Sequence, residues 1–345
     1  MDIAELLTFA CEQGASDLHI SAGEPPLLRV DGAVKKVNMG AISPEQAQAM
    51  LYDIMGDAHR KIFEEKSDVD FSIDLGSRAR FRVNIFWQRR GMGGVFRQIP
   101  SNVMTLDDLM MPPVLAELTQ AEKGLVIVTG PTGSGKSTTL AAMIEYINEG
   151  QQKHIITIED PIEFVHRSKK CLINQREVGT HTQSFSNALR AALREDPDII
   201  LVGEMRDLET IQLALTAAET GHLVFATLHT ANAPKTVDRI IDVFPPSQQS
   251  QVRTMLSESL NAVIAQTLCA RPRGGRVAAV EILLGTHAVR NLIRESKIHQ
   301  LHGVMQTAQS VGMQTLDMHL QDLVARGIIT PEVARTKATD KKLFG

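Results

Sequence analysis

The chain has 345 residues, of which 43% are hydrophobic and 22% charged, and its formal net charge is -4. The length predicts about two domains of an ordinary soluble protein. The acidic balance and the scarcity of aromatic residues (4%) argue against a nucleic-acid motor, which needs basic grooves and stacking surfaces. Three scattered cysteines form neither a disulfide framework nor a paired metal motif. We expect a cytosolic protein without a membrane span or secretory leader.

Residues 1–100 predict a small α+β domain. An apolar helical face at residues 3–10 precedes a hairpin pattern in which residues 27–30 and 34–37 flank Asp31-Gly32, a dipeptide typical of two-residue turns. Ser43 and Pro44 predict the N-cap and first position of a helix. Further strands are expected at residues 71–74, 80–87 and 92–99.

The last of these hairpins places two arginines together. If its turn centres near Arg89 and Arg90, Arg82 and Arg97 lie opposite one another on one face. Like charges directly opposite across a strand pair are destabilising unless an anion lies near them. The residues alone leave two interpretations open, a clamp for a phosphate and two solvated surface arginines.

Prolines mark the domain boundary. Pro100 and the Pro112-Pro113 pair bracket a linker, residues 101–113, in which we expect one short apolar helix. Residues 114–345 then form the second domain.

The second domain is organised around GPTGSGKST, which matches the phosphate-binding loop pattern G-x-x-x-x-G-K-[ST]. An apolar strand at residues 125–128 precedes it, and an apolar stripe at helical spacing follows it, which is the context the motif requires. The glycines turn backbone N–H groups toward an anion at a helix N-terminus. We expect Lys136 to reach the β- and γ-phosphates of ATP and the Ser137 hydroxyl to bind Mg²⁺. The candidate nucleotide-binding residues of the loop are Gly130, Pro131, Thr132, Gly133, Ser134, Gly135, Lys136, Ser137 and Thr138.

Alternating strands and helices predict an α/β core with a parallel sheet. Strands are expected at residues 125–129, 154–158, 199–202 and 223–227, and helices at residues 136–148, 184–194 and 208–220. After Pro245-Pro246 the chain is expected to be mainly helical, with one strand pair or ribbon around residues 277–284.

Carboxylates follow two of these strands. Glu204 ends the apolar strand IILVG and would lie at the ligand edge of the sheet, acting on Mg²⁺ most simply through water. The segment IEDPIE places three carboxylates within five residues, and one of them would act as a general base toward the attacking water.

Two histidines flank the strand at residues 223–227. His229 follows its carboxyl end, where it would sense a γ-phosphate, whereas His222 begins it at the far end of the sheet, where a structural role is equally reasonable. Their spacing offers too few ligands for a metal. Arginines of the core would stabilise transition-state charge from a neighbouring subunit; the candidates are Arg190, Arg194, Arg206 and Arg239.

A capped amphipathic helix is expected from about residue 286. Val289, Leu292 and Ile293 form its buried stripe, and Arg290 and Arg294 repeat on another face. A solvated face is the simpler interpretation of two like charges at this spacing, and a partner surface is the alternative.

Together, GPTGSGKST, IEDPIE, IILVGEMRDLET and TGHLVFATLHTANA resemble the ATPases of type II secretion and type IV pili, over essentially the whole chain. The helix AVRNLIRE resembles the signature of the pilus retraction ATPases within that family, and a four-cysteine zinc motif typical of assembly ATPases is missing around Cys269. The resemblance implies a RecA-like P-loop core with a PAS-like N-terminal domain, a helical C-terminal part and assembly as a homohexamer.

The resemblance also implies roles for particular residues. Glu163 is the catalytic base, Glu204 the atypical Walker B acid, and His222 and His229 the His box, with His222 at the nucleotide. Arg82 and Arg97 reach the nucleotide from the N-terminal domain. The coupling helix comprises Ala288, Val289, Arg290, Asn291, Leu292, Ile293, Arg294 and Glu295.

The implied function is hydrolysis of ATP to power pilus retraction, with an inner-membrane platform protein as partner and a paralogous accessory ATPase as a further one. The protein would be cytoplasmic and peripheral at the inner membrane through protein contacts. Alternatives are an accessory retraction ATPase, a type II secretion or pilus assembly ATPase, a RecA-like nucleic-acid motor, and a scaffold that binds ATP without hydrolysing it.

Overall fold

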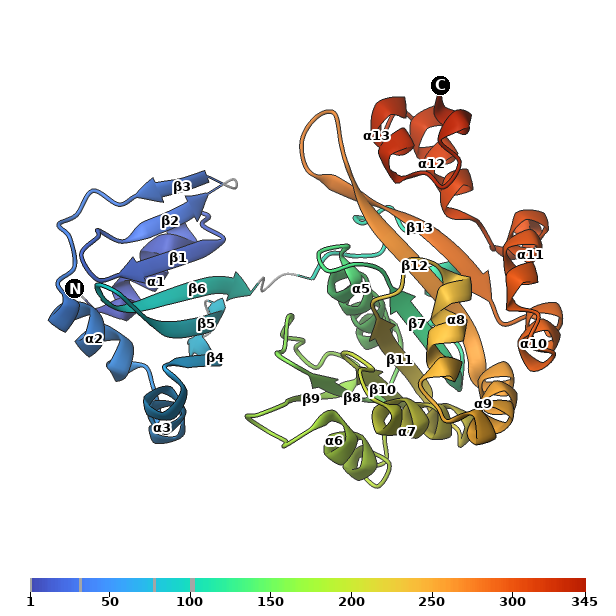
Figure 1. Cartoon of the computed structure of the whole chain (residues 1–345), viewed down its shortest axis with the longest axis horizontal. Coiled ribbons are helices and arrows are strands. Elements are labelled where there is room, and N and C mark those ends of the chain that lie inside the picture. The colour runs from blue at the N-terminus through green and yellow to red at the C-terminus, as the bar shows by residue number, and fades with distance from the viewer. Residues whose placement is uncertain (1, 31–32, 77–78, 100–102) are drawn as a thin grey trace. The chain divides into compact units, whose positions relative to one another are not determined.

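The structure is a computed structural model that describes residues 2–30, 33–76, 79–99 and 103–345 (Figure 1). By its internal contacts the chain divides into two compact units, Met1–Asn102 and Val103–Gly345. Within the described ranges, no helix is both long enough and apolar enough to cross a bilayer.

The N-terminal unit is an antiparallel sheet packed against helices. In the part of the chain that is described, six strands lie in the order β3-β2-β1-β6-β5-β4. Its elements are α1 (Ile3–Glu12), β1 (Asp17–Ser21), β2 (Leu27–Val30), β3 (Ala33–Lys36), α2 (Pro44–Asp53), α3 (Asp57–Lys66), β4 (Asp68–Leu75), β5 (Ala79–Gln88) and β6 (Gly91–Ile99). The predicted strands and the helix start are confirmed. The predicted turn residues Asp31 and Gly32 lie outside the described residues, although Val30 and Ala33 on either side are paired.

Local sequence explains where α2 begins. The Gln46 N–H donates to Ser43 Oγ at 3.2 Å, and the Ser43 N–H donates to Gln46 Oε1 at 2.9 Å, so two N-terminal donors are satisfied reciprocally. Pro44 occupies the first turn, where its missing N–H costs nothing. Ala47 and Leu51 are buried in the core of this unit, which fixes the face that α2 turns toward β6.

The two arginines of the β5–β6 hairpin lie directly opposite each other, as predicted. The register also pairs Gln88 with Gly91, which places Arg89 and Arg90 in the turn. The structure supplies a carboxylate for each of the facing arginines. Arg97 Nε lies 2.9 Å from Asp17 Oδ1, and Arg82 Nε lies 3.9 Å from Asp70 Oδ1. Their mutual repulsion is therefore offset within the unit, although both side chains remain about half or more exposed (47% for Arg82, 68% for Arg97).

The second unit is a doubly wound α/β core followed by a helical C-terminal part. Its elements are α4 (Val114–Leu118), β7 (Gly124–Thr129), α5 (Lys136–Gly150), β8 (His154–Glu159), β9 (Leu172–Glu177), α6 (Phe185–Ala192), β10 (Ile199–Val202), α7 (Leu208–Glu219), β11 (Leu223–Leu228), α8 (Ala233–Asp242), α9 (Pro246–Ser259), β12 (Leu260–Ala270), β13 (Arg276–Leu284), α10 (His287–Arg294), η1 (Ile298–Gln300), α11 (Leu301–Thr307), η2 (Gln309–Val311), α12 (Leu316–Ala325), α13 (Pro331–Lys337) and η3 (Lys341–Phe344).

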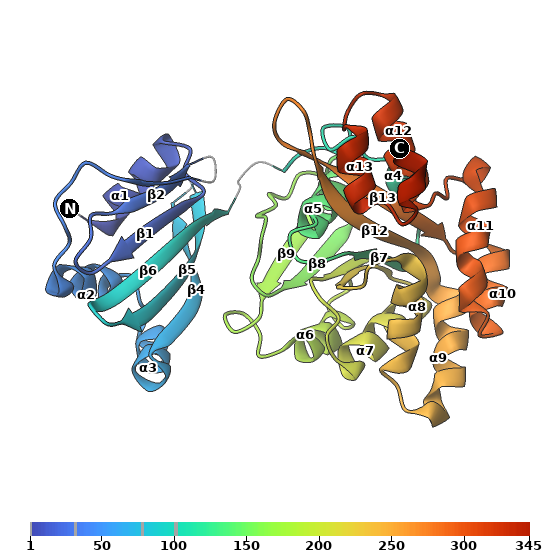
Figure 2. The same cartoon turned by 45° about the horizontal axis from the view of Figure 1, so that its top comes forward.

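The core sheet has the strand order β13-β12-β7-β11-β10-β8-β9. All neighbouring pairs in it are parallel except β12–β13, which is an antiparallel ribbon at one edge. Helices α4 and α5 cover one face, and α6 to α9 cover the other, each over its own apolar cluster. Because both faces are covered, the central strands are continuous apolar runs, which is why the sequence revealed them. Figure 2 shows the ribbon reaching the C-terminal helices, where α12 and α13 pack on it.

Three expectations differ from the structure. The short helix expected between Pro100 and Pro112 is instead a turn at residues 106–110, which ends at Met110 with a positive φ of 54°. The stretch after Pro246 is less helical than expected, because the eleven residues of β12 continue directly from α9 as a buried strand. Strand β9 was not predicted, because its sequence LINQRE alternates only weakly between buried and exposed positions.

Candidate nucleotide site

The loop between β7 and α5 has the backbone that the motif predicts. Gly130, Gly133 and Gly135 have φ values of 140°, 78° and 88°, a region that side chains disfavour. A Cβ on Gly130 would lie 2.3 Å from the carbonyl oxygen of Gln266 and 2.7 Å from Ser134 Oγ. Only glycine therefore fits where the loop leaves β7 and passes against β12.

The geometry of this loop fits an anion. No side chain caps the N-terminus of α5, so its first N–H groups and its dipole are directed at the loop. Ser134 Oγ is buried and has no hydrogen-bond partner among the described residues. Ser137 and Thr138 are half-buried on the first turn of α5, whereas Pro131, Thr132 and Gly133 are exposed at the crown of the loop.

Lys136 is buried at 8% exposure and lies inside the loop. Its Nζ donates to the carbonyl oxygens of Gly130 (2.9 Å) and Pro131 (3.2 Å). Burial lowers the pKa of Lys136, while the negative charges of Glu204 and Glu163 act in the opposite direction. A buried ammonium surrounded by backbone carbonyls is suited to a phosphate, which offers a full charge in place of partial ones.

A polar chain runs from Lys136 across the carboxyl edge of the sheet. Lys136 Nζ lies 3.2 Å from His229 Nδ1, and His229 Nε2 lies 3.2 Å from Glu204 Oε1. Arg206 Nη2 contacts the other oxygen of Glu204 at 2.8 Å, and Arg206 Nη1 lies 3.9 Å from Asp160 Oδ2. The structure thus brings together three predicted site residues and connects them to the acidic loop after β8.

The three carboxylates of IEDPIE differ in their surroundings. Glu159, the last residue of β8, is half-buried, and desolvation raises its pKa despite hydrogen bonds from Thr157 Oγ1 (2.7 Å) and Gln175 Nε2 (3.2 Å). Glu163 is exposed, and its own N–H donates to Glu159 Oε2 at 3.4 Å. Of the two glutamates, Glu163 is therefore the one whose carboxylate is available to solvent beside the site.

The other predicted residues lie away from the loop. His222 precedes β11 at the opposite edge of the sheet, where its carbonyl accepts from the N–H of Gly124, the first residue of β7. Its Nδ1 lies 3.0 Å from the carbonyl oxygen of Ala217 in α7. His222 therefore lies at the edge of the sheet opposite the ligand edge, because parallel strands start there, and its assignment to the nucleotide stays a prediction. Arg82 and Arg97 belong to the N-terminal unit.

Sequence reasoning missed the residue that fastens the loop to the sheet. Gln266 in β12 is 3% exposed, its Nε2 donates to the Ser134 carbonyl at 2.7 Å, and its Oε1 accepts from Thr139 Oγ1 at 3.0 Å. No motif marks a lone glutamine. A polar residue within the apolar run of β12 was the one available signal.

The predicted coupling helix is α10. It begins at the amino ends of the parallel strands, whereas the phosphate loop lies at their carboxyl ends. Val289 and Ile293 are buried and Leu292 packs beside them, which confirms the predicted stripe. Arg290 donates to the carbonyl oxygens of Gly285 (2.7 Å) and Glu258 (3.0 Å), so it holds the helix in place. The exposed residues of this helix are His287, Ala288, Asn291, Arg294 and the C-cap Glu295.

Strand, glycine loop, helix and a carboxylate just after β10, which is separated from β7 by β11, define a P-loop nucleotide-binding protein with a RecA-like α/β core. A profile of the type II/IV secretion system proteins matches residues 1–273. The chain belongs to this family.

Relatives within the family cover nearly the whole chain. It is 62% identical over 338 residues to the type IV pilus retraction ATPase PilT of Pseudomonas aeruginosa, which covers 98% of both chains. It is 44% identical over 339 residues to the type IV pilus ATPase PilU of the same organism, which covers 98% of this chain and 89% of PilU. A crystal structure of the pilus retraction motor PilT with bound ADP superposes with a TM-score of 0.93 at 49% identity, over 99% of this chain and 98% of that one.

Proposed function

We propose that this chain is an ATPase motor that hydrolyses ATP to power retraction of type IV pili. The observation that carries the proposal is the 62% identity to a pilus retraction ATPase across 98% of both chains. The loop geometry supports the ATPase part, since a buried lysine, a glycine-restricted loop and an uncapped helix N-terminus together favour a polyphosphate.

The residues of the core have distinct roles in hydrolysis. Lys136 would exchange its carbonyl partners for the β- and γ-phosphates, and Ser137 would hold Mg²⁺, which would supply positive charge to the phosphates. Glu163 orients and deprotonates the attacking water. Glu204 would act on Mg²⁺ through water, and His229, which contacts both Lys136 and Glu204, would respond to the presence of the γ-phosphate.

The working form is a homohexamer at the cytoplasmic face of the inner membrane. In it, Arg82 and Arg97 reach the nucleotide of a neighbouring subunit, and both are exposed enough to exchange their carboxylate partners for phosphate. The motor acts on an inner-membrane platform protein and works beside a paralogous accessory ATPase. The exposed face of α10 is the surface through which the motor engages its load, because the hydrogen bond of Arg294 within the described residues is a local one, 3.3 Å from Asn291 Oδ1.

An accessory role is the nearest alternative. The lower identity to PilU (44%) than to PilT (62%) favours the retraction motor itself. The acidic net charge disfavours a nucleic-acid motor, and hydrolysis that is indifferent to single-stranded DNA would exclude it.

The test compares two arginines of the same helix. Arg294→Ala removes an exposed charge, whereas Arg290→Ala removes two bonds that hold the helix. We expect Arg294→Ala to retain ATP hydrolysis by the purified protein and to lose pilus retraction in cells. Retraction at the normal rate with Arg294→Ala would overturn the role of α10. A folded Glu163→Ala protein that still hydrolyses ATP normally would overturn the proposed chemistry.

A further inference from the structure

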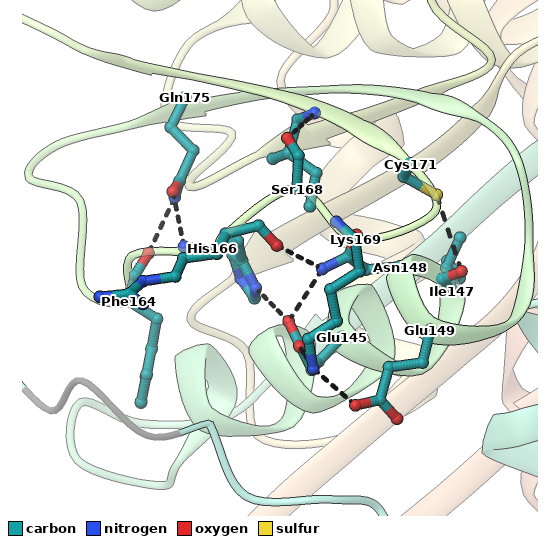
Figure 3. A network of polar contacts seen from close by, with 12 residues as sticks. Glu145, Ile147, Asn148, Glu149, Phe164, His166, Ser168, Lys169, Cys171 and Gln175 are labelled. Atoms are coloured by element: carbon teal, nitrogen blue, oxygen red, sulfur yellow. Dashed lines mark hydrogen bonds and ion pairs between the residues drawn. The ribbon is translucent and has the colours of Figure 1, made fainter.

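The segment between β8 and β9, residues 160–171, carries Glu163 but has no regular secondary structure. In a loop without backbone ladders, side chains from neighbouring elements must satisfy the backbone and fix its path. Two elements supply them here, strand β9 and the second half of helix α5 (Figure 3).

Strand β9 holds the near end of the segment through Gln175. Its Nε2 donates to the Phe164 carbonyl at 2.8 Å, and its Oε1 accepts from the His166 N–H at 2.8 Å. The same amide reaches Glu159 Oε1 at 3.2 Å. Glu163 therefore lies between two anchored neighbours, while its own carboxylate stays exposed.

Helix α5 holds the far end through Asn148. Its Nδ2 donates to the Arg167 carbonyl at 2.8 Å, and its Oδ1 accepts from the Lys169 N–H at 2.9 Å. One amide side chain thus satisfies a donor and an acceptor of the loop backbone, which fixes its distance from α5 as well as its direction.

Glu145 is the charged centre of this network. Its Oε2 lies 3.0 Å from His166 Nδ1, and its Oε1 lies 2.6 Å from Lys169 Nζ. The His166 side chain is 4% exposed and that of Glu145 is 15% exposed, so this contact is shielded from solvent. Burial would raise the pKa of Glu145, but hydrogen bonds from Lys169, His166 and Asn148 outweigh it and lower that pKa. The carboxylate is therefore ionised and committed to the loop.

The position of Glu145 in the chain gives this contact its meaning. Helix α5 begins at Lys136, so Glu145 lies nine residues, roughly 14 Å at 1.5 Å per residue, along the helix that carries the phosphate loop. Along the chain, α5 is connected to this segment through residues 151–153 and β8. The network therefore connects the segment that carries the proposed base to α5, the helix that follows the phosphate loop.

We propose that Glu145 is a positioning residue for ATP hydrolysis, which acts through His166 and Lys169 to hold Glu163 at a fixed place relative to the phosphate loop. This proposal rests on the proposed function, in which Glu163 is the base. Glu145 itself does not touch the nucleotide. Removal of the Glu145 carboxylate would leave the phosphate loop intact but would allow Glu163 to occupy a wider range of positions.

The experiment measures kcat and KM for ATP in the full-length protein carrying Glu145→Ala. A displacement of about 1 Å can cost on the order of 100-fold in rate, and we expect kcat to fall about tenfold or more. We expect KM and the affinity for a fluorescent ADP to change less than about twofold, because binding energy made equally in ground and transition states is untouched. Glu145→Gln keeps the size of the side chain and one acceptor oxygen but replaces the second acceptor with an NH2 donor, so it should recover only part of the rate.

Glu149→Ala is the matched control. Glu149 lies one turn further along α5 and is 55% exposed, and among the described residues its carboxylate has an ion pair with Lys169 alone, at 2.6 Å. It should hydrolyse ATP at about the wild-type rate, because exposed ion pairs contribute little. If Glu149→Ala and Glu145→Ala slow hydrolysis equally, the effect is one of surface charge and the proposal is wrong.

A double-mutant cycle shows whether Glu145 works through Glu163. The double variant Glu145→Ala/Glu163→Ala should be no slower than Glu163→Ala alone, since a misplaced base cannot be lost twice. Additive losses, or a parallel fall in ADP affinity, would show a merely structural role. An inactive Glu163→Ala beside a fully active Glu145→Ala would overturn this inference and leave the proposed function standing. An active Glu163→Ala would overturn the proposed chemistry instead.

Local hydrogen exchange gives a readout independent of catalysis. In Glu145→Ala, amides of residues 160–171 should lose protection while those of the phosphate loop keep it. If Glu145→Ala does not fold, Asn148→Ala tests the same loop without removing a charge, and it should show the same fall in kcat at constant KM. Unchanged kcat in a folded Asn148→Ala protein would then overturn the proposal.

Discussion

Gln266→Leu tests whether β12 holds the phosphate loop in shape. The substitution removes two hydrogen bonds of the loop, to the Ser134 carbonyl and the Thr139 hydroxyl, at a site where Gln266 is 3% exposed. A hydrogen bond contributes about 1 kcal/mol net, and a buried partner left unsatisfied costs about 1–3 kcal/mol, so we expect a local loss of about 2–4 kcal/mol. This corresponds to an increase of about 30-fold to about 700-fold in local opening, at about 1.4 kcal/mol per factor of ten.

The assay is amide hydrogen exchange of residues 130–139 in the full-length protein, with ADP affinity measured beside it. The Thr139 N–H, which donates to the Gly135 carbonyl at 3.0 Å, reports the first turn of α5 directly. Exchange there should quicken by the calculated factor, and ADP affinity should fall, because part of the binding energy is then spent on ordering the loop.

Thr139→Val supplies the control. It removes the hydroxyl that Gln266 Oε1 accepts from, while keeping nearly the same shape in a fully buried place. The double variant should lose less than the sum of the two single losses, by about 1 kcal/mol, because no hydroxyl is then left without its partner. Wild-type exchange in Gln266→Leu would refute the reasoning, as would strictly additive losses.

Three further predictions concern stability. Gly130→Ala should lower the melting temperature more than Gly133→Ala. Both residues have positive φ, but only a Cβ at position 130 would meet backbone, 2.3 Å from a carbonyl oxygen of β12. Equal decreases in melting temperature would mean that backbone strain alone determines the effect. Burial lowers the pKa of His319 from 6.5 to about 4. Between these two pH values the unfolded state binds more protons than the folded state, so up to about 3 kcal/mol of stability is lost as the pH falls from 6.5 to about 4. His319→Gln should therefore flatten the dependence of the melting temperature on pH in this range. Asp17→Asn should destabilise the N-terminal unit by about 1 kcal/mol, since it removes the charge that offsets Arg97 opposite another arginine, although solvent screens the 68% exposed Arg97. Fluorescence of the chain's one tryptophan, which lies in β5, monitors that unit, and an unchanged midpoint would contradict the prediction.

The sequence predicted most reliably what depends on local pattern. The central strands are unbroken apolar runs, and the phosphate loop is a fixed string between one such strand and a helix. The opposition of Arg82 and Arg97 followed from the position of the turn and the two-residue period of strands. In each case the information lies within about ten residues of the feature.

What the sequence did not predict depends on long-range contacts. Strand β12 follows α9 without a turn residue between them, so its apolar residues continue a helical pattern, and only its place beside β7 makes it a strand. Gln266 and Gln175 are ordinary amides, and their importance arises from partners such as Ser134, which lies 132 residues from Gln266 in sequence. His222 and His229 lie at opposite edges of the sheet, as expected from their places before and after β11, whereas the role at the nucleotide that the resemblance gives His222 stays a prediction.

The ribbon of β12 and β13 also has a mechanical consequence. At the carboxyl ends of the parallel strands, β12 binds the phosphate loop through Gln266. Strand β13 runs back to the opposite end of these strands, where Thr286 caps α10. The two ends are separated by roughly 20 Å, the length of about six residues in a strand. Nearly every residue between these two ends is buried, so the closely packed strands transmit a displacement with little deformation. We therefore expect nucleotide binding and hydrolysis to move α10 as a rigid body. The load would then contact a surface of constant shape whose position changes.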